Sequence, residues 1–152
     1  MILESLLAYA HILAILTLVV FSTSEAALCR IQWMNAQVVE RLVTVDRIYG
    51  GAAVVLLLTG IARTWWGFKG TAWYWTNWLL LLKVGLFVVV ALMSIKPTLM
   101  FIRWRRQLRA DGSLPGETDV RLARKWVMVQ AHLIAVIPLA AVFLARGYGV
   151  KA

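Results

Sequence analysis

Cysteine is almost absent from this chain of 152 residues, which contains only Cys29. A single thiol excludes an internal disulfide, a CxxC redox motif, a zinc site built on several cysteines and the attachment of a c-type haem. Charged residues are scarce too, at 15% of the chain, and 62% of the residues are hydrophobic. A soluble domain carries about 25% charged residues. In water, a chain of this size and composition would have more apolar surface than it could bury, and the remainder would be exposed to solvent. This excludes a soluble enzyme domain.

Four stretches are long and apolar enough to cross a hydrocarbon core, which takes about 20 helical residues. They cover residues 3–28, 46–66, 73–96 and 126–145 approximately. No internal repeat, low-complexity tract or second domain is visible in the sequence. The sequence therefore predicts an all-α fold, a single integral membrane four-helix bundle over residues 1–152, with residues 97–125 forming a basic cytoplasmic loop. Within this loop a helix is expected to leave the membrane after Pro97, residues 111–116 form a turn, and a helix capped by Thr118 continues into the fourth span.

Acidic residues are few as well, seven against sixteen lysines and arginines, which gives a net charge of +9. Eleven of these cations lie in the two connections that follow the first and third spans. The opposite side has four, namely Arg63, Lys69, Arg146 and Lys151. The positive-inside rule then predicts cytoplasmic connections and both termini outside, in a bacterial inner membrane. The basic surplus is explained by orientation and by contact with anionic lipid of the bilayer, so no nucleic-acid partner is expected.

Ionisable residues inside a bilayer are costly and usually face the interior of the bundle. The spans contain four such residues, each on a narrow polar stripe at helical spacing. The stripes are Glu4, His11, Leu18, Ser22 and Glu25 in the first span, Thr76, Lys83, Val90 and Ser94 in the third, and Arg121, Lys125, His132, Leu139 and Arg146 in the fourth. We predict that all three stripes face a common interior. Two structural ion pairs are expected there, Glu25 with Arg124 or Lys125 and Glu4 with Arg146.

Two of these residues are expected to lie at the same depth in the membrane. At about 1.5 Å per residue, His11 and Lys83 both lie about 12 Å below the outer surface, and His132 lies about 7 Å deeper. A neutral imidazole is the commonest metal ligand, and a desolvated lysine loses its proton readily enough to act as one. Two nitrogen ligands on different helices predict a haem b site. The small residues Gly50 to Ala53 would leave room for a flat macrocycle or for a closely packed helix.

Short motifs carry a resemblance to known families over residues 5–147. The motifs are Tyr9-Ala10-His11-Ile12-Leu13, Glu40-Arg41-Leu42, Arg47 leading to Gly60, and Trp78 followed by Lys83. With them, the chain resembles the four-helix HemJ-type protoporphyrinogen oxidases. It more closely resembles an uncharacterised bacterial family of four-span membrane proteins, which shares the ending Gln130-Ala131-His132-Leu133, Pro138-Leu139 and Ala145-Arg146-Gly147. In the oxidase family a first-helix histidine and a third-helix lysine are implicated in haem binding, which implies these roles for His11 and Lys83.

The long basic third connection and His132 depart from the oxidase pattern. Either His132 replaces Lys83 as the second ligand, or it serves another role such as proton transfer. A haem propionate would meet Arg47 if it points inward, or Arg63, Lys69 or Arg146 if it points outward. The expected function is that of a haem b-binding membrane protein with a redox role, an oxidoreductase whose partner is a porphyrin or a quinone.

Two alternatives remain open. The first is a cofactor-free transport or proton-conducting module in which Glu25, His11, Lys83 and His132 form a relay. Four helices are few for transport, so a homo-oligomer would be needed to build a pore. The second alternative is a structural membrane subunit in which the polar stripes serve helix association alone.

Overall fold

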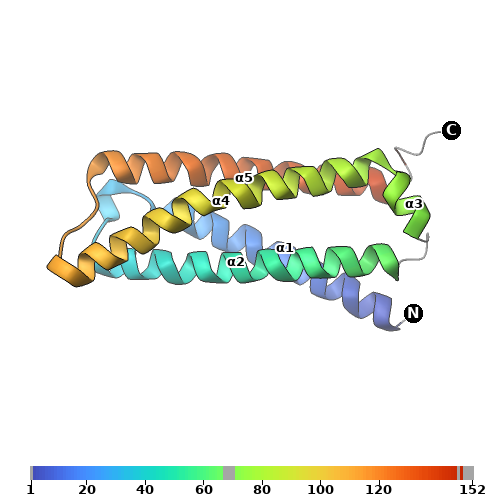
Figure 1. The fold of residues 1–152 in the computed structure, drawn as a ribbon, viewed down its shortest axis with the longest axis horizontal. Coiled ribbons are helices and arrows are strands. Elements are labelled where there is room, and N and C mark those ends of the chain that lie inside the picture. The colour runs from blue at the N-terminus through green and yellow to red at the C-terminus, as the bar shows by residue number, and fades with distance from the viewer. Residues whose placement is uncertain (1, 67–70, 147, 149–152) are drawn as a thin grey trace.

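The computed structural model describes residues 2–66, 71–146 and 148, which form helices joined by short connections (Figure 1). In chain order the elements are α1 (Ile2–Leu28), the short 3₁₀ helix η1 (Ile31–Trp33), α2 (Ala36–Trp65), α3 (Thr71–Thr76), α4 (Trp78–Asp111) and α5 (Glu117–Ala145). Lys69, Gly147 and Lys151 lie outside the described residues. The all-α fold predicted from the sequence is confirmed.

Helices α1, α2, α4 and α5 are each long and apolar enough to cross a membrane. In the most apolar stretch of each helix, only 17% to 28% of the residues are buried inside the bundle. Apolar surface of this extent on the outside of a protein needs an apolar environment. The outward faces of these helices are therefore suited to lipid chains, and the four predicted spans are confirmed as helices of membrane length.

The predicted boundaries differ from the helices on the side expected to be cytoplasmic. Helix α2 already begins at Ala36, because Asn35 Oδ1 accepts a hydrogen bond of 2.9 Å from the Val38 amide and caps the helix. In the basic segment 97–125 the predicted helix, turn and second helix are confirmed, since α4 continues to Asp111 and α5 starts at Glu117, one residue before the predicted cap Thr118. Phe101 and Trp104 explain the extension of α4, because both side chains are fully buried in the core.

The third predicted span also begins later than expected. Residues 71–76 form the separate helix α3, and α4 starts only at Trp78. Asn77 separates the two helices, with extended backbone angles and a side-chain oxygen that accepts a 2.9 Å hydrogen bond from the Leu79 amide. A capping asparagine inside an aromatic-rich stretch thus moves the start of the helix from residue 73 to residue 78.

The long helices form two closely packed pairs, α1 with α2 and α4 with α5. Contacts of α2 with α4 and of α1 with α5 join the pairs into a bundle, so α1 and α4 occupy opposite corners. The start of α1, the end of α5 and the α3 connection lie at one end, and the 112–116 connection lies at the other (Figure 1). We call these the outer and inner ends, after the predicted orientation.

Two apolar clusters form the core. The inner core cluster contains Cys29, Val38, Val39, Leu42, Val43, Met100, Phe101, Trp104, Val120, Ala123 and Val127. The middle core cluster is centred on Leu18, Tyr49, Ala52, Val90 and Ile134. The middle core cluster draws on all four long helices, and the inner core cluster draws on α2, α4, α5 and Cys29, which directly follows α1. The two clusters hold the bundle together from its centre to its inner end.

Candidate functional site

Most residues of the stripe predicted on α1 face the interior of the bundle in the structure. Leu18, Ser22 and Glu25 are buried, and His11 is half-buried. On α4, Val90 is buried and Lys83 and Ser94 are half-buried, whereas Thr76, at the end of α3, is exposed. These two helices therefore place His11 and Lys83 on their inward sides, in the outer half of the bundle.

His11 is held by the neighbouring helix α2 through one hydrogen bond and one close packing contact. Its Nδ1 lies 2.9 Å from Thr59 Oγ1. The Thr59 hydroxyl donates its own hydrogen to the Val55 carbonyl at 2.8 Å, so toward His11 it accepts. With the hydroxyl in this orientation, the neutral imidazole carries its proton on Nδ1, and the lone pair of Nε2 is free. A histidine that ligates a metal is oriented in the same way, by donating its other ring N–H.

Gly60 lets the imidazole approach α2 this closely. A Cβ atom at Gly60 would lie 3.3 Å from His11 Cε1, which is tighter than most contacts of real Cβ atoms. Gly50 and Gly51 differ, since both are exposed and a Cβ at either position would meet nothing within 4 Å. Of the run Gly50 to Ala53, the two glycines therefore contact no helix of this bundle, whereas Ala52 is buried in the middle core cluster and Ala53 packs against that cluster.

Two cations lie near His11, both in the outer half of the bundle. Lys83 on α4 and Arg63 on α2 are close enough for their charges to act on the imidazole, and they also act on each other. Arg63 follows Thr59 by one helical turn and is partly buried. His11, Lys83 and Arg63 form what we call the outer site.

His132 is not part of this interior. It is exposed on α5, and its Nδ1 lies 2.6 Å from the Met128 carbonyl of the preceding turn. The inward face of α5 is instead formed by Val120, Ala123, Val127, Gln130 and Ile134. The predicted interior stripe on this helix is therefore wrong, because apolar burial and not the polar stripe sets the rotation of α5.

Arg47 also lies away from the outer site. Its side chain is exposed, and twelve residues of α2 separate it from Thr59, a rise of about 18 Å along the helix. Among the described residues, Arg63 is the cation of α2 that lies beside His11. Its position agrees with the alternative in which a haem propionate points toward the outer end. Neither predicted ion pair is present among the described residues, as Glu25 joins neither Arg124 nor Lys125 and Glu4 does not join Arg146.

Glu25 lies in a second polar group, which the polar stripes of the sequence predict only in part. It is 2% exposed, and Asp46 and Gln130, at 7% and 1%, are buried with it inside the bundle. Asp46 accepts a 2.8 Å hydrogen bond from Thr98 Oγ1. Helical spacing gives the missing signal, because Val39, Leu42, Val43, Asp46 and Tyr49 form one buried face of α2.

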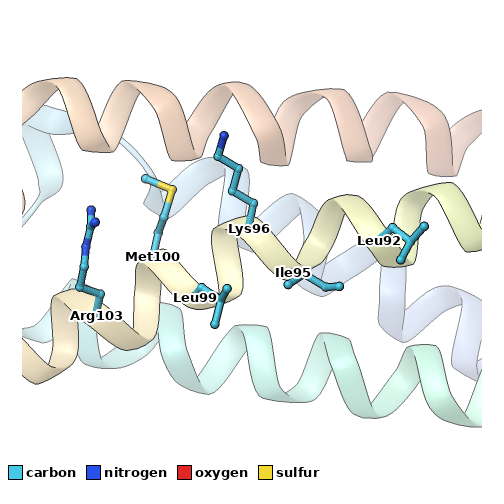
Figure 2. Close-up of a pocket in the computed structure, with 6 residues that line it drawn as sticks. All are labelled: Leu92, Ile95, Lys96, Leu99, Met100 and Arg103. Carbon is cyan, nitrogen blue, oxygen red and sulfur yellow. The ribbon is translucent and has the colours of Figure 1, made fainter.

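A groove of about 410 Å³ runs along the inner half of α4, lined by Leu92, Ile95, Lys96, Leu99, Met100 and Arg103. Lys96, Met100 and Arg103 point from it toward α5 (Figure 2). Lys96 Nζ lies 4.6 Å from the centre of the Trp126 ring, and Arg103 pairs with Asp119 at 3.1 Å. These contacts tie the basic part of α4 to α5, and none of the residues predicted to bind a cofactor lines this groove.

Together, the four membrane-length helices and the ionisable residues between them define an integral membrane helical bundle. Within the described ranges, no group of three or more His, Cys, Asp or Glu side chains is placed to hold a metal ion. The chain belongs to a family of predicted membrane proteins (DUF2214), whose model matches residues 3–149. No curated protein and no solved structure matches it significantly.

Proposed function

We propose that this protein binds haem b in the outer half of the bundle and has a redox role there. The observation that carries the proposal is the geometry of His11. Thr59 accepts the Nδ1 hydrogen, and this leaves the Nε2 lone pair available to an iron ion. His11 and Lys83, on helices at opposite corners of the bundle, would hold the haem iron.

The surroundings of His11 suit such a group. Arg63 supplies a positive charge for a propionate on the outer side. The middle core cluster closes the site toward the inner end with apolar side chains, which keep water away from a bound macrocycle. When bound, haem supplies one-electron chemistry, and the protein's part is to position it and to set its potential. His132, exposed on α5, is not assigned to this haem.

The resemblance to HemJ-type protoporphyrinogen oxidases supports the same pair, His11 and Lys83. A porphyrin or a quinone is the corresponding partner, and oxidoreductase activity on one of them is the corresponding reaction. A cofactor-free relay has less support. The middle core cluster separates His11 from Glu25, which lies fourteen residues or about 21 Å further along α1. A continuous polar path between them is not formed by the residues that the structure describes.

The experiment is an absorption spectrum of the protein, purified in mild detergent from cells supplied with haem precursor. We expect a Soret band that shifts on reduction with dithionite. His11→Ala should remove the band, and Lys83→Ala should alter its position or intensity. His132→Ala, a change of the same size on the lipid-facing side, should leave the spectrum unchanged and serves as the control.

Two results would contradict the proposal. A colourless wild-type preparation would exclude bound haem under these conditions, and a spectrum unchanged by His11→Ala would exclude His11 as a ligand. If the preparation is colourless, reconstituted vesicles that dissipate a pH gradient would favour the proton-conducting alternative. Vesicles that hold the gradient would favour a structural subunit.

A further inference from the structure

A layer of polar side chains lies between the two apolar clusters of the core. On α1, Ser22 and Glu25 lie between residues of the middle and inner core clusters, and Asp46 has the corresponding position on α2. Thr98 on α4 and Gln130 on α5 complete what we call the inner polar layer. All four long helices contribute to it, and it is separate from the outer site.

Two atoms of this layer are buried without a hydrogen-bond partner among the described residues. One is Glu25 Oε1, an acceptor, and the other is Gln130 Nε2, an amide donor. The side chains are 2% and 1% exposed, and they belong to α1 and α5, which are neighbours in the bundle. An unpaired buried polar atom costs free energy, and a small occupant that both accepts and donates hydrogen bonds removes that cost for both atoms.

Two carboxyl groups share the layer, and no basic side chain of the described residues forms an ion pair with either. Asp46 is close enough to Glu25 for their charges to repel each other. The other titratable groups near them are Tyr49 on α2 and Cys29 at the end of α1. On the facing helices, α4 contributes the neutral Thr98, and Arg124 of α5 acts on Cys29. Two ionised carboxylates buried in one apolar interior are not stable without a compensating positive charge, so a positive occupant is needed.

We propose that the buried carboxyl groups of Glu25 and Asp46 form a proton-binding site that holds one exchangeable proton, and that a water molecule links Glu25 to Gln130. A metal cation would satisfy Glu25 Oε1 but would leave the amide hydrogens of Gln130 without an acceptor. Water donates to the carboxyl oxygen and accepts from the amide. The proton binds to a carboxylate oxygen and leaves it again as the O–H bond forms and breaks; no electron is transferred and no other covalent bond changes.

The site is independent of haem binding, so its test does not require a coloured protein. Infrared spectroscopy of the chain in lipid vesicles detects the C=O stretch of a protonated carboxyl group. Exposed carboxyl groups are ionised at neutral pH and do not contribute to this band. We expect the band at neutral pH, with a shift in deuterated water. Glu25→Gln and Asp46→Asn should each change the band's position, and the double variant should remove it.

Matched variants show whether the band comes from this pair of carboxyl groups. Glu40→Gln changes a carboxylate that pairs with Arg109 at the inner surface, and it should leave the band unchanged. Gln130→Leu should shift the band by removing the partner of the linking water. Circular dichroism and elution volume identify the variants that fold. If only one of Glu25→Gln and Asp46→Asn folds, that variant is sufficient for the comparison with the wild type.

Three outcomes would overturn the proposal. The first is the absence of a protonated-carboxyl band at neutral pH. The second is a band that the Glu25→Gln/Asp46→Asn double variant retains. The third is loss of the band when sodium, magnesium or calcium chloride is added at constant pH, because a metal cation would then be the occupant.

Discussion

The two histidines show how the environment of one residue type decides its use. His11 is half-buried against α2, with its Nδ1 on Thr59, while His132 is exposed and contacts its own helix. In the sequence, each of the two histidines belongs to a polar stripe at helical spacing. Only His11 has a partner on another helix, and that partner fixes which ring nitrogen is free. A ligand role at the residue scale thus depends on Thr59, which no pattern in the sequence distinguishes from the other threonines.

Gly60 offers a test of this dependence at the residue scale. Gly60→Ala adds a Cβ 3.3 Å from His11 Cε1, so the ring must shift by a few tenths of an ångström. We expect a smaller fraction of the purified chain to hold haem, and a displaced Soret band, measured by absorption.

Gly51→Ala is the matched control for Gly60→Ala. It gains about the same helix propensity, about 1 kcal/mol, and its Cβ meets nothing within 4 Å. Haem occupancy should therefore equal that of the wild type. Equal spectra for the two variants would contradict the packing of His11 against Gly60.

At the scale of the element, the helix boundaries depend on caps and on buried faces more than on hydropathy. Two asparagines, Asn35 and Asn77, start α2 and α4 by accepting hydrogen bonds from amides of the first turn. The inner end of α4 remains helical past Lys96 because Phe101 and Trp104 are buried there. A hydropathy pattern finds the apolar part of a helix, whereas the polar extension of α4 is predicted by helical spacing after Pro97 and by the turn residues 111–116 that follow it.

Replacement of Asn77 tests the cap of α4. Asn77→Ala removes the acceptor for the Leu79 amide and the donor to the Tyr148 carbonyl, in a side chain that is 1% exposed. We expect a loss of about 1–2 kcal/mol in the free energy of unfolding, measured by denaturation with SDS in mixed micelles. Asn77→Ser retains a capping oxygen and should recover part of this loss. Equal losses in the two variants would show that the cap does not stabilise α4.

On the scale of the whole molecule, the bundle places its polar groups at two levels. The outer site lies toward the end where α1 starts, and the inner polar layer lies between the middle and inner core clusters. Apolar packing separates the two levels, so each is expected to work without a direct proton path to the other. The two levels make the ends of the molecule different, and the basic residues predict which end faces the cytoplasm.

Cysteine labelling tests the orientation. In a Cys29→Ser background, Ser113→Cys places a thiol in the connection between α4 and α5, and Ala72→Cys places one on α3. Both positions are exposed. In intact cells, a membrane-impermeant maleimide should label the cysteine at position 72 at once and that at position 113 only after permeabilisation. The opposite pattern would show that the termini face the cytoplasm.

The sequence by itself determined the class of this protein. Hydropathy predicts four membrane-length helices, because the cost of burying charge in lipid leaves long apolar runs that are visible without a structure. Helical spacing also identifies His11, Glu25 and Lys83 as ionisable residues on inward faces. Family membership over residues 3–149 agrees with the class, and the haem site is still a prediction.

The tertiary structure alone decided which polar residues meet. It placed His132 and Arg47 on the outside and Asp46 and Gln130 inside. The physical reason is that helix rotation follows the sum of apolar contacts with several neighbours, and a stripe on one helix contains no information about them. The few charged residues of the sequence therefore fall into two groups. Most lie at the ends of the helices and predict the orientation, and a small number are enclosed by the bundle.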